Sequence, residues 1–186
     1  MKDSDNIVGV IPFSGGMEIN FYLTSSRGSY FANIRQFARS SKYAGPTKKG
    51  ISFNKTRLQK IVELLETLPA DIENIEAKVI SDIPLHKGKS IRLSIAYFNG
   101  KYGIDIREYF TTPKYNGPGK SGIRIPYEYI NELKEYCRIM LPKLDEWPED
   151  TLFHENEPQG ENNIHPEEGE KQDVEGVPDE YKQFFE

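Results

Sequence analysis

Apolar runs and segments rich in β-forming residues, separated by turn signals, recur along the first 125 residues and predict β-strands. In the first half, the strand candidates are residues 7–11, 18–24, 30–37 and 51–53. Ser14-Gly15-Gly16 and the segment 25–28 are turn signals between them. A helix is expected after Asn54, its N-cap, because apolar residues recur at helical spacing up to Pro69: Leu58, Ile61, Val62, Leu65 and Leu68. The pattern predicts four strands followed by one helix.

The same order recurs in the second half. Strand candidates are residues 77–83, 90–98, 101–110 and 123–125, and Asn99-Gly100 is the strongest hairpin signal in the chain. Pro126 suits the first turn of a helix, whose apolar stripe is Ile130, Leu133, Tyr136, Cys137, Met140 and Leu141. Both helical stripes are typical of core positions, packed on the sheet or on each other, so they indicate architecture rather than chemistry.

The two halves are copies of each other. A shift of 72 residues aligns the chain with itself without a gap from about Asn6 to Leu68, so that Ile34-Arg35 falls on Ile106-Arg107. Two copies at one spacing predict two copies of one structural unit. We therefore expect an α+β chain with a first repeat at residues 1–70, a second at 71–148 and a tail at 149–186. Units this small bury little apolar surface alone and gain stability by packing on each other.

Charge is distributed unevenly between the repeats and the tail. Residues 149–186 carry 13 acidic and two basic side chains, a net −11, whereas residues 1–148 carry 22 basic and 16 acidic ones, a net +6. The basic body suggests an anionic polymer as partner. The tail is too polar to form a core and is expected to be disordered. We interpret its aromatic end, Tyr181, Phe184 and Phe185, as a docking peptide for a partner protein, the alternative being an end without function.

Other classes of protein find little support in the sequence. Long apolar runs and a signal peptide are absent, so we expect no membrane span and a cytoplasmic location. Cys137 is the single cysteine, and His86, His154 and His165 are far apart, so neither a disulfide nor a metal centre is expected. Gly119-Lys120-Ser121 lacks the upstream glycine of a phosphate-binding loop and leads into a strand. Without a recognisable catalytic set, we expect neither an enzyme nor a cofactor.

The third strand of each repeat carries the candidate binding face. Alternation places Phe31, Asn33, Arg35 and Phe37 opposite Tyr30, Ala32 and Ile34, and Asp105, Arg107 and Tyr109 opposite Tyr102, Ile104 and Ile106. With the isoleucine face buried, each repeat would expose an Arg and, two residues later, an aromatic ring. The Arg can clamp a phosphate, and the ring can stack on a base, which stabilises binding by roughly 1–3 kcal/mol. The alternative is a buried or paired Arg beside a packed ring.

The segment after each third strand adds lysines. It reads KYAGPTKKG (42–50) in the first repeat and KYNGPGKSG (114–122) in the second, and we interpret it as a loop in which Gly and Pro let the backbone approach a ligand. Its candidate contacts are Lys42, Tyr43, Lys48, Lys114, Tyr115 and Lys120. A cationic rim beside an aromatic sheet face, without a recognition helix, favours single-stranded nucleic acid. No 2′-hydroxyl reader is recognisable, so both DNA and RNA stay open as ligands.

These residues resemble a known family. The run Gly-Ile-Asp-Ile-Arg-Glu-Tyr-Phe (103–110), followed by Gly-Pro-Gly-Lys-Ser-Gly (117–122), looks like the single-strand-binding domain of the transcriptional coactivator family called positive cofactor four. The resemblance implies a curved four-stranded antiparallel sheet plus a C-terminal helix, paired two-fold through the helices. In this chain the two repeats would pair with each other as an intramolecular pseudo-dimer.

The same resemblance implies which residues contact the ligand. In the second repeat they are Phe98, Lys101, Arg107, Phe110 and Lys120. In the first repeat Arg35 and Lys48 keep the residue type, whereas Ser26, Ser29 and Ala38 stand at the hairpin and aromatic positions, with Arg27, Lys49 and Phe37 next to them.

The acidic tail is similar to that of bacterial and phage single-strand-binding proteins, whose tails recruit replication enzymes and compete with DNA. By this analogy, we expect sequence-tolerant binding of single-stranded DNA in phage or bacterial replication or recombination, in the cytoplasm and at the nucleoid. The tail would recruit replication or recombination proteins and weaken DNA binding, and further self-association is left open. The alternatives are a transcription regulator that binds promoter DNA or RNA polymerase, and a protein-interaction module without nucleic acid.

Overall fold

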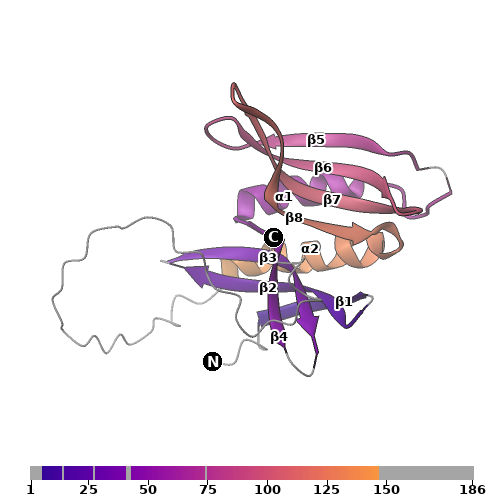
Figure 1. Ribbon diagram of the computed structural model, residues 1–186. Helices are drawn as coiled ribbons and strands as arrows, with labels where there is room; N and C mark the ends of the chain where they lie inside the picture. The colour runs from indigo at the N-terminus through magenta and orange to yellow at the C-terminus, as the bar shows by residue number, and fades with distance from the viewer. Residues whose placement is uncertain (1–5, 14, 27, 41–42, 74, 147–186) are drawn as a thin grey trace.

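The computed structural model describes residues 6–13, 15–26, 28–40, 43–73 and 75–146, which form an eight-stranded sheet and two α-helices (Figure 1). The first half contains β1 (Ile7–Phe13), β2 (Met17–Ser26), β3 (Ser29–Arg39), β4 (Ala44–Phe53) and α1 (Lys55–Glu66). The second half contains β5 (Lys78–Pro84), β6 (Lys89–Phe98), β7 (Lys101–Thr112), β8 (Tyr115–Pro126), a 3₁₀ turn η2 (Tyr127–Tyr129) and α2 (Ile130–Glu146). Both halves therefore have the predicted order of four strands and a helix.

All neighbouring strands are antiparallel, and their spatial order is β1-β2-β3-β4-β8-β7-β6-β5. The second half thus repeats the order of the first in reverse, and the fourth strands meet at the seam. There Gly50 of β4 pairs with Gly122 of β8. These two glycines are separated by the same 72 positions as the two copies of the sequence.

The helices join the two halves into one core. The helix α2, from the second half, packs on β1, β2 and β3 of the first half, and it also contacts α1. The ring of Tyr136 on α2 lies 5.0 Å from the ring of Phe21, and a side chain at Gly9 would collide with it. The buried apolar residues of both halves form a single cluster. Neither half closes its core without the other.

The helix boundaries follow from local signals. The side chain of Asn54 accepts a hydrogen bond from the Arg57 amide at 3.0 Å, which confirms Asn54 as the N-cap of α1. Pro126 opens the 3₁₀ turn rather than α2 itself, which begins four residues later at Ile130. The predicted stripe of α2 is buried or half-buried throughout, as expected for core positions. No helix in the described ranges is long and apolar enough to cross a bilayer.

The fourth strands correct one prediction. Residues 44–50 and 115–122, expected as loops, belong to β4 and β8 and pair with the third strands except at residues 47–49 and 119–121. The hydroxyl of Tyr115 donates to the Pro118 carbonyl at 2.8 Å, and Tyr43 does the same to Pro46. The tyrosine hydroxyl also lies close to the glycine between these two residues, where a Cβ would not fit. The Gly-Pro pair is therefore held in an extended conformation, and its composition alone suggested a turn.

Candidate nucleic-acid interface

The third strands divide their side chains between core and surface as the alternation predicts. Ile34, Ile104 and Ile106 are completely buried, which confirms the isoleucine face as the core face. Arg35 and Arg107 lie on the opposite face, which we call the outer face of the sheet, and both are half-buried. Each of these arginines stands directly opposite a seam glycine, Arg35 opposite Gly50 and Arg107 opposite Gly122.

The seam glycines provide the space in which the two arginines lie. A Cβ at Gly122 would be 2.8 Å from Cγ of Arg107, and one at Gly50 would be 2.9 Å from Cγ of Arg35. Real Cβ atoms do not approach other atoms this closely, so the arginine stems run across the bare glycine backbone. This close approach explains on physical grounds why the sequence has glycine at both positions.

The two arginines differ in their partners. Arg107 donates to both carboxylate oxygens of Asp105, at 3.1 and 3.3 Å, and both side chains are partly exposed. Arg35 donates to the Thr47 carbonyl at 3.0 Å and has no carboxylate partner in the described part of the chain. Ion pairs at a protein surface are worth about 1 kcal/mol or less. A phosphate, which arginine binds with the same bidentate geometry, can therefore replace Asp105.

A bulge next to each arginine presents lysines. In the first half, residues 47–49 of β4 stand opposite Gln36 alone, because Arg35 pairs with Gly50 and Phe37 with Pro46. The hydroxyl of Thr47 donates to the Gln36 carbonyl at 3.0 Å and holds the bulge, which carries Lys48 and Lys49. The second half has the equivalent bulge at residues 119–121, with Lys120. Bulges redirect side chains at binding surfaces, so the lysines have a defined position instead of sitting in a loose loop.

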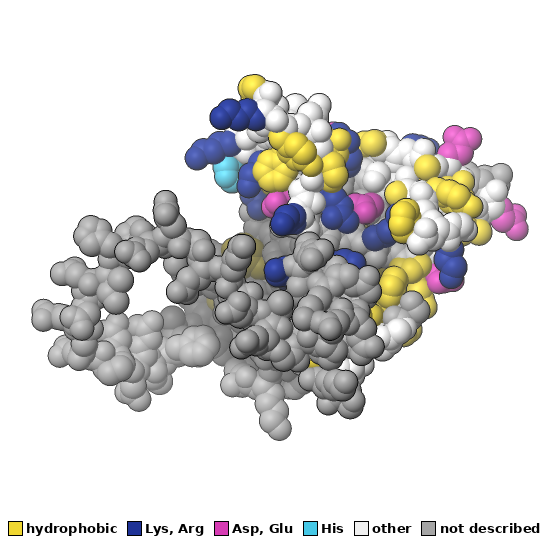
Figure 2. Space-filling model, in the orientation of Figure 1, with side chains coloured by type: hydrophobic (Ala, Val, Ile, Leu, Met, Phe, Trp, Pro, Cys, Tyr) yellow, Lys and Arg dark blue, Asp and Glu magenta, His cyan; other side chains and the backbone are white. Residues whose placement is uncertain are grey.

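A groove of about 460 Å³ crosses the seam and contains residues from both halves. From the second half it is lined by Phe98 and Lys101 of the β6–β7 hairpin and by Arg107 and Arg124 of β7 and β8, and Lys49 joins them from the first half. We call these five residues the seam groove. Phe98 is 61% exposed, and the Arg124 guanidinium lies 5.3 Å from its ring centroid. Figure 2 shows Lys and Arg side chains gathered around exposed hydrophobic ones over the second half.

Electrostatics at the seam groove favour an anion. Partial burial, together with the positive charge of Arg107, lowers the pKa of Lys49 below its usual value. Asp105, which is paired with Arg107, also lines the groove, so a phosphate would compete with this carboxylate for Arg107 and would gain Lys49 as a second cationic partner. The groove therefore combines an exposed ring with four cations, of which Arg107 is paired with Asp105.

Apart from Tyr109, the remaining predicted residues of the second half lie at or beside a separate hollow on the β7–β8 hairpin. This hollow, also about 460 Å³, is lined by Phe110, Tyr115 and Lys120 among others. The rings of Phe110 and Tyr115 are 6.1 Å apart, and Tyr115 is 51% exposed. Lys114 is exposed in the turn beside them. The hairpin thus offers a second cationic and aromatic surface.

Tyr109 is not the open platform that its position predicted. The guanidinium of Arg92 lies 3.6 Å from the centroid of its ring and covers it. Arg92 also donates to both carboxylate oxygens of Asp82, at 2.9 and 2.8 Å, and these hydrogen bonds lower the pKa of Asp82 below its usual range. The ring of Tyr109 is therefore covered by Arg92, an arginine of the neighbouring strand that is itself paired with a carboxylate.

The predicted residues of the first half are less concentrated. Phe31, Phe37 and Tyr43 are half-buried, and Phe37 makes an edge contact with Tyr22 at 5.9 Å. Lys48 is exposed in its bulge. The expectations for Arg27, Lys42, the acidic tail and its end at Tyr181, Phe184 and Phe185 concern positions outside the described residues.

Two arginines of the outer face were not among the predicted contacts. Arg92 and Arg124 each stand between buried apolar neighbours, in Ile-Arg-Leu (91–93) and Ile-Arg-Ile (123–125). The alternation that assigned the face of Arg107 assigns the same face to both of them. The signal that could have found them was therefore present in the sequence.

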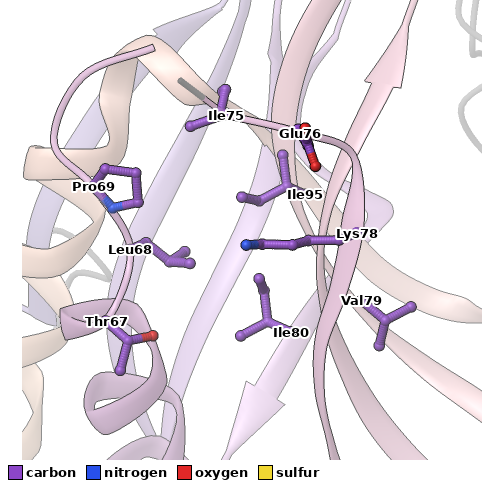
Figure 3. A pocket seen from close by; sticks show the side chains of 9 residues that line it. All are labelled: Thr67, Leu68, Pro69, Ile75, Glu76, Lys78, Val79, Ile80 and Ile95. Atoms are coloured by element: carbon purple, nitrogen blue, oxygen red, sulfur yellow. The ribbon is translucent and has the colours of Figure 1, made fainter. Parts of the chain in front are cut away.

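A further hollow lies apart from this face. It is lined by the segment that follows α1, by the start of β5 and by Ile95 of β6, has a volume of about 330 Å³, and contains no predicted site residue (Figure 3). Apolar side chains line it together with Thr67, Glu76 and Lys78. It does not contribute to the interface described above.

Taken together, the sheet and its outer face present cations and exposed rings on an open β-surface, an arrangement suited to an anionic ligand. Residues 85–136 match the family described as Transcriptional Coactivator p15 (PC4). The matched segment lies within the second repeat, covers less than a third of the chain, and supports the resemblance found there in the sequence. The match favours binding of nucleic acid. A search of curated proteins found no match to the chain.

Proposed function

We propose that this protein binds single-stranded DNA without strong sequence preference across the outer face of its sheet. The observation that supports this most is the seam groove, where Phe98 stands exposed among Lys49, Lys101, Arg107 and Arg124. Rings stack bases of any identity, and the cations bind the phosphate backbone. The match to the coactivator family agrees with such a ligand.

The proposal extends to the organisation of the chain. Residues 1–70 and 71–148 act as one intramolecular pseudo-dimer, so that one chain supplies the two faces for which most members of the family use two chains. Residues 149–186 form an acidic tail that recruits replication or recombination proteins through its aromatic end and competes with DNA for the basic face. The setting would be a bacterial or phage-infected cell, with the protein cytoplasmic and associated with the nucleoid.

The test is fluorescence anisotropy with matched single-stranded and double-stranded oligonucleotides over a range of salt concentrations. We expect preference for the single strand, and a logarithm of affinity that falls with the logarithm of salt by about 0.7 per neutralised phosphate. Deletion of residues 149–186 should tighten binding at low salt, since an internal polyanion is removed. A flat salt response would refute the cationic surface, and unchanged affinity after the deletion would refute competition by the tail.

The description of the matched family also supports a second function, regulation of transcription. The same titration separates the two. Strong preference for one duplex sequence, or binding to RNA polymerase without single-stranded DNA, would favour the regulator.

A further inference from the structure

We infer that the two halves do not share the single strand equally, and that the seam groove on the second half is the primary site. This inference rests on the proposed function and specifies where on the outer face the strand binds first. In this arrangement the first half contributes Lys49 across the seam, while its own outer face binds weakly.

Equivalent positions of the two halves differ in chemistry where the groove is formed. Positions 72 apart can be compared directly, because both copies have the same strands in the same order. At three groove positions the first half has serine where the second half has a ring or a cation: Ser26 against Phe98, Ser29 against Lys101 and Ser52 against Arg124. The first half therefore lacks an exposed ring and two positive charges at these positions.

The outer face of the first half uses its polar groups internally. The amide of Asn33 donates to the Thr24 hydroxyl at 2.9 Å, and the Ser52 hydroxyl donates to Asn33 at 2.6 Å. Asn33 occupies the position of Asp105, so the first half has a neutral hydrogen-bonded cluster where the second has charged groups. This neutral cluster offers no positive charge to a phosphate, whereas the position equivalent to Ser52 in the second half is Arg124.

The seam brings positive charge from the first half to the second. Lys49 lines the groove beside Arg107, although it belongs to β4 and stands in the bulge next to Gly50. Partial desolvation and the charge of Arg107 both lower the pKa of the Lys49 ammonium group. The groove therefore draws cations from both halves, and a strand that enters it contacts both sides of the seam.

The decisive experiment compares Arg107→Ala with Arg35→Ala in the full chain, with anisotropy of a labelled single-stranded oligonucleotide of about eight nucleotides. The two arginines are equivalent in position and each lies over a seam glycine, so they form a matched pair. We expect Arg107→Ala to weaken binding by about 10-fold or more, and Arg35→Ala by less than about 3-fold, since charged contacts to phosphate dominate affinity. Equal losses would overturn the inference.

Reciprocal exchanges of the groove residues extend the comparison. Phe98→Ser with Lys101→Ser gives the second half the residues of the first, and we expect weaker binding and a salt dependence shallower by about 0.7 in slope. Ser26→Phe with Ser29→Lys makes the opposite exchange, and binding should tighten. Lys143→Ser, on the exposed side of α2, controls for the loss of one positive charge and should change neither the affinity nor the slope of its salt dependence. All four exchanged positions are exposed, so the fold should persist, which circular dichroism verifies.

The outcomes separate this inference from the proposed function. If the unaltered protein fails to bind any single strand, the proposed function is wrong. If it binds, but both arginines contribute alike or titration reveals two equal sites per chain, the function stands and the unequal use of the two halves is wrong.

Discussion

Replacement of a seam glycine by alanine tests the packing on which the interface depends. In Gly122→Ala the new Cβ would lie 2.8 Å from Cγ and 2.9 Å from Cβ of Arg107. These atoms form the stem of the side chain, next to the backbone, so they cannot move aside without shifting Arg107 itself. The substitution should therefore change both stability and the position of the guanidinium.

The magnitude follows from two opposing effects. Overpacking a site of this kind costs about 1–3 kcal/mol, and alanine returns about 0.5–1 kcal/mol because it restricts the unfolded chain more than glycine does. The net loss should be up to about 2.5 kcal/mol, which lowers Tm by up to roughly 10 °C for a chain of this size. Differential scanning fluorimetry and urea titration measure this change, with Ser121→Ala as the control for a neighbouring exposed position.

Gly50→Ala is the matched substitution in the first half. Its Cβ would lie 2.9 Å from Cγ of Arg35 and 3.0 Å from the Ile34 carbonyl oxygen, so a similar loss of stability is expected. If the second half holds the primary site, Gly122→Ala should weaken DNA binding more than Gly50→Ala. Unchanged stability and binding in Gly122→Ala would show that the arginine does not lie across the glycine, and the account of the seam would then be wrong.

Three further predictions concern other parts of the chain. Burial raises the pKa of Cys137 from 9.0 to about 12, so the stability of the fold should hold below pH 9 and fall as the pH rises from 9 toward 12. Urea midpoints measured across this pH range test the fall, and thiol labelling of the native protein at pH 8 should be slow. Tyr127→Phe removes the hydrogen bond to the Pro69 carbonyl at 2.8 Å and should cost about 1 kcal/mol in a urea titration. Asp82→Asn removes the carboxylate bound to Arg92, so single-strand affinity should rise and the salt slope steepen by up to about 0.7; unchanged binding would show that Arg92 stays on Tyr109.

Much of the fold can be predicted from the sequence because the periodicity of apolar residues and the capping of helices depend on residues that are neighbours in the chain. The isoleucine faces of the third strands and the cap at Asn54 depend on residues close in sequence, and both match the structure. The full length of the fourth strands could not be predicted in this way. Their glycines and prolines are typical of turns, and the bond from Tyr115 to Pro118 that keeps the segment extended becomes visible only once the side chains are placed.

In the candidate site, too, some features follow from local sequence pattern and others depend on contacts between distant positions. Alternation identifies the face of Arg107, and it would have identified the face of Arg124 as well. The presence of Lys49 beside Arg107 depends on the pairing of Gly50 with Gly122, a contact between positions far apart in the chain. The contact of the Arg92 guanidinium with the Tyr109 ring likewise depends on the register between β6 and β7. Such long-range contacts are not encoded in any local pattern.

The packing of α2 on the strands of the first half has a consequence for synthesis on the ribosome. When α1 has just emerged, Gly9 and Phe21 still lack the Tyr136 ring that covers them in the finished protein. At a translation rate of about 5–20 residues per second, several seconds pass before that ring is made. During this interval the nascent chain exposes an apolar sheet surface, so its early half should be a substrate for chaperones that hold incomplete polypeptides.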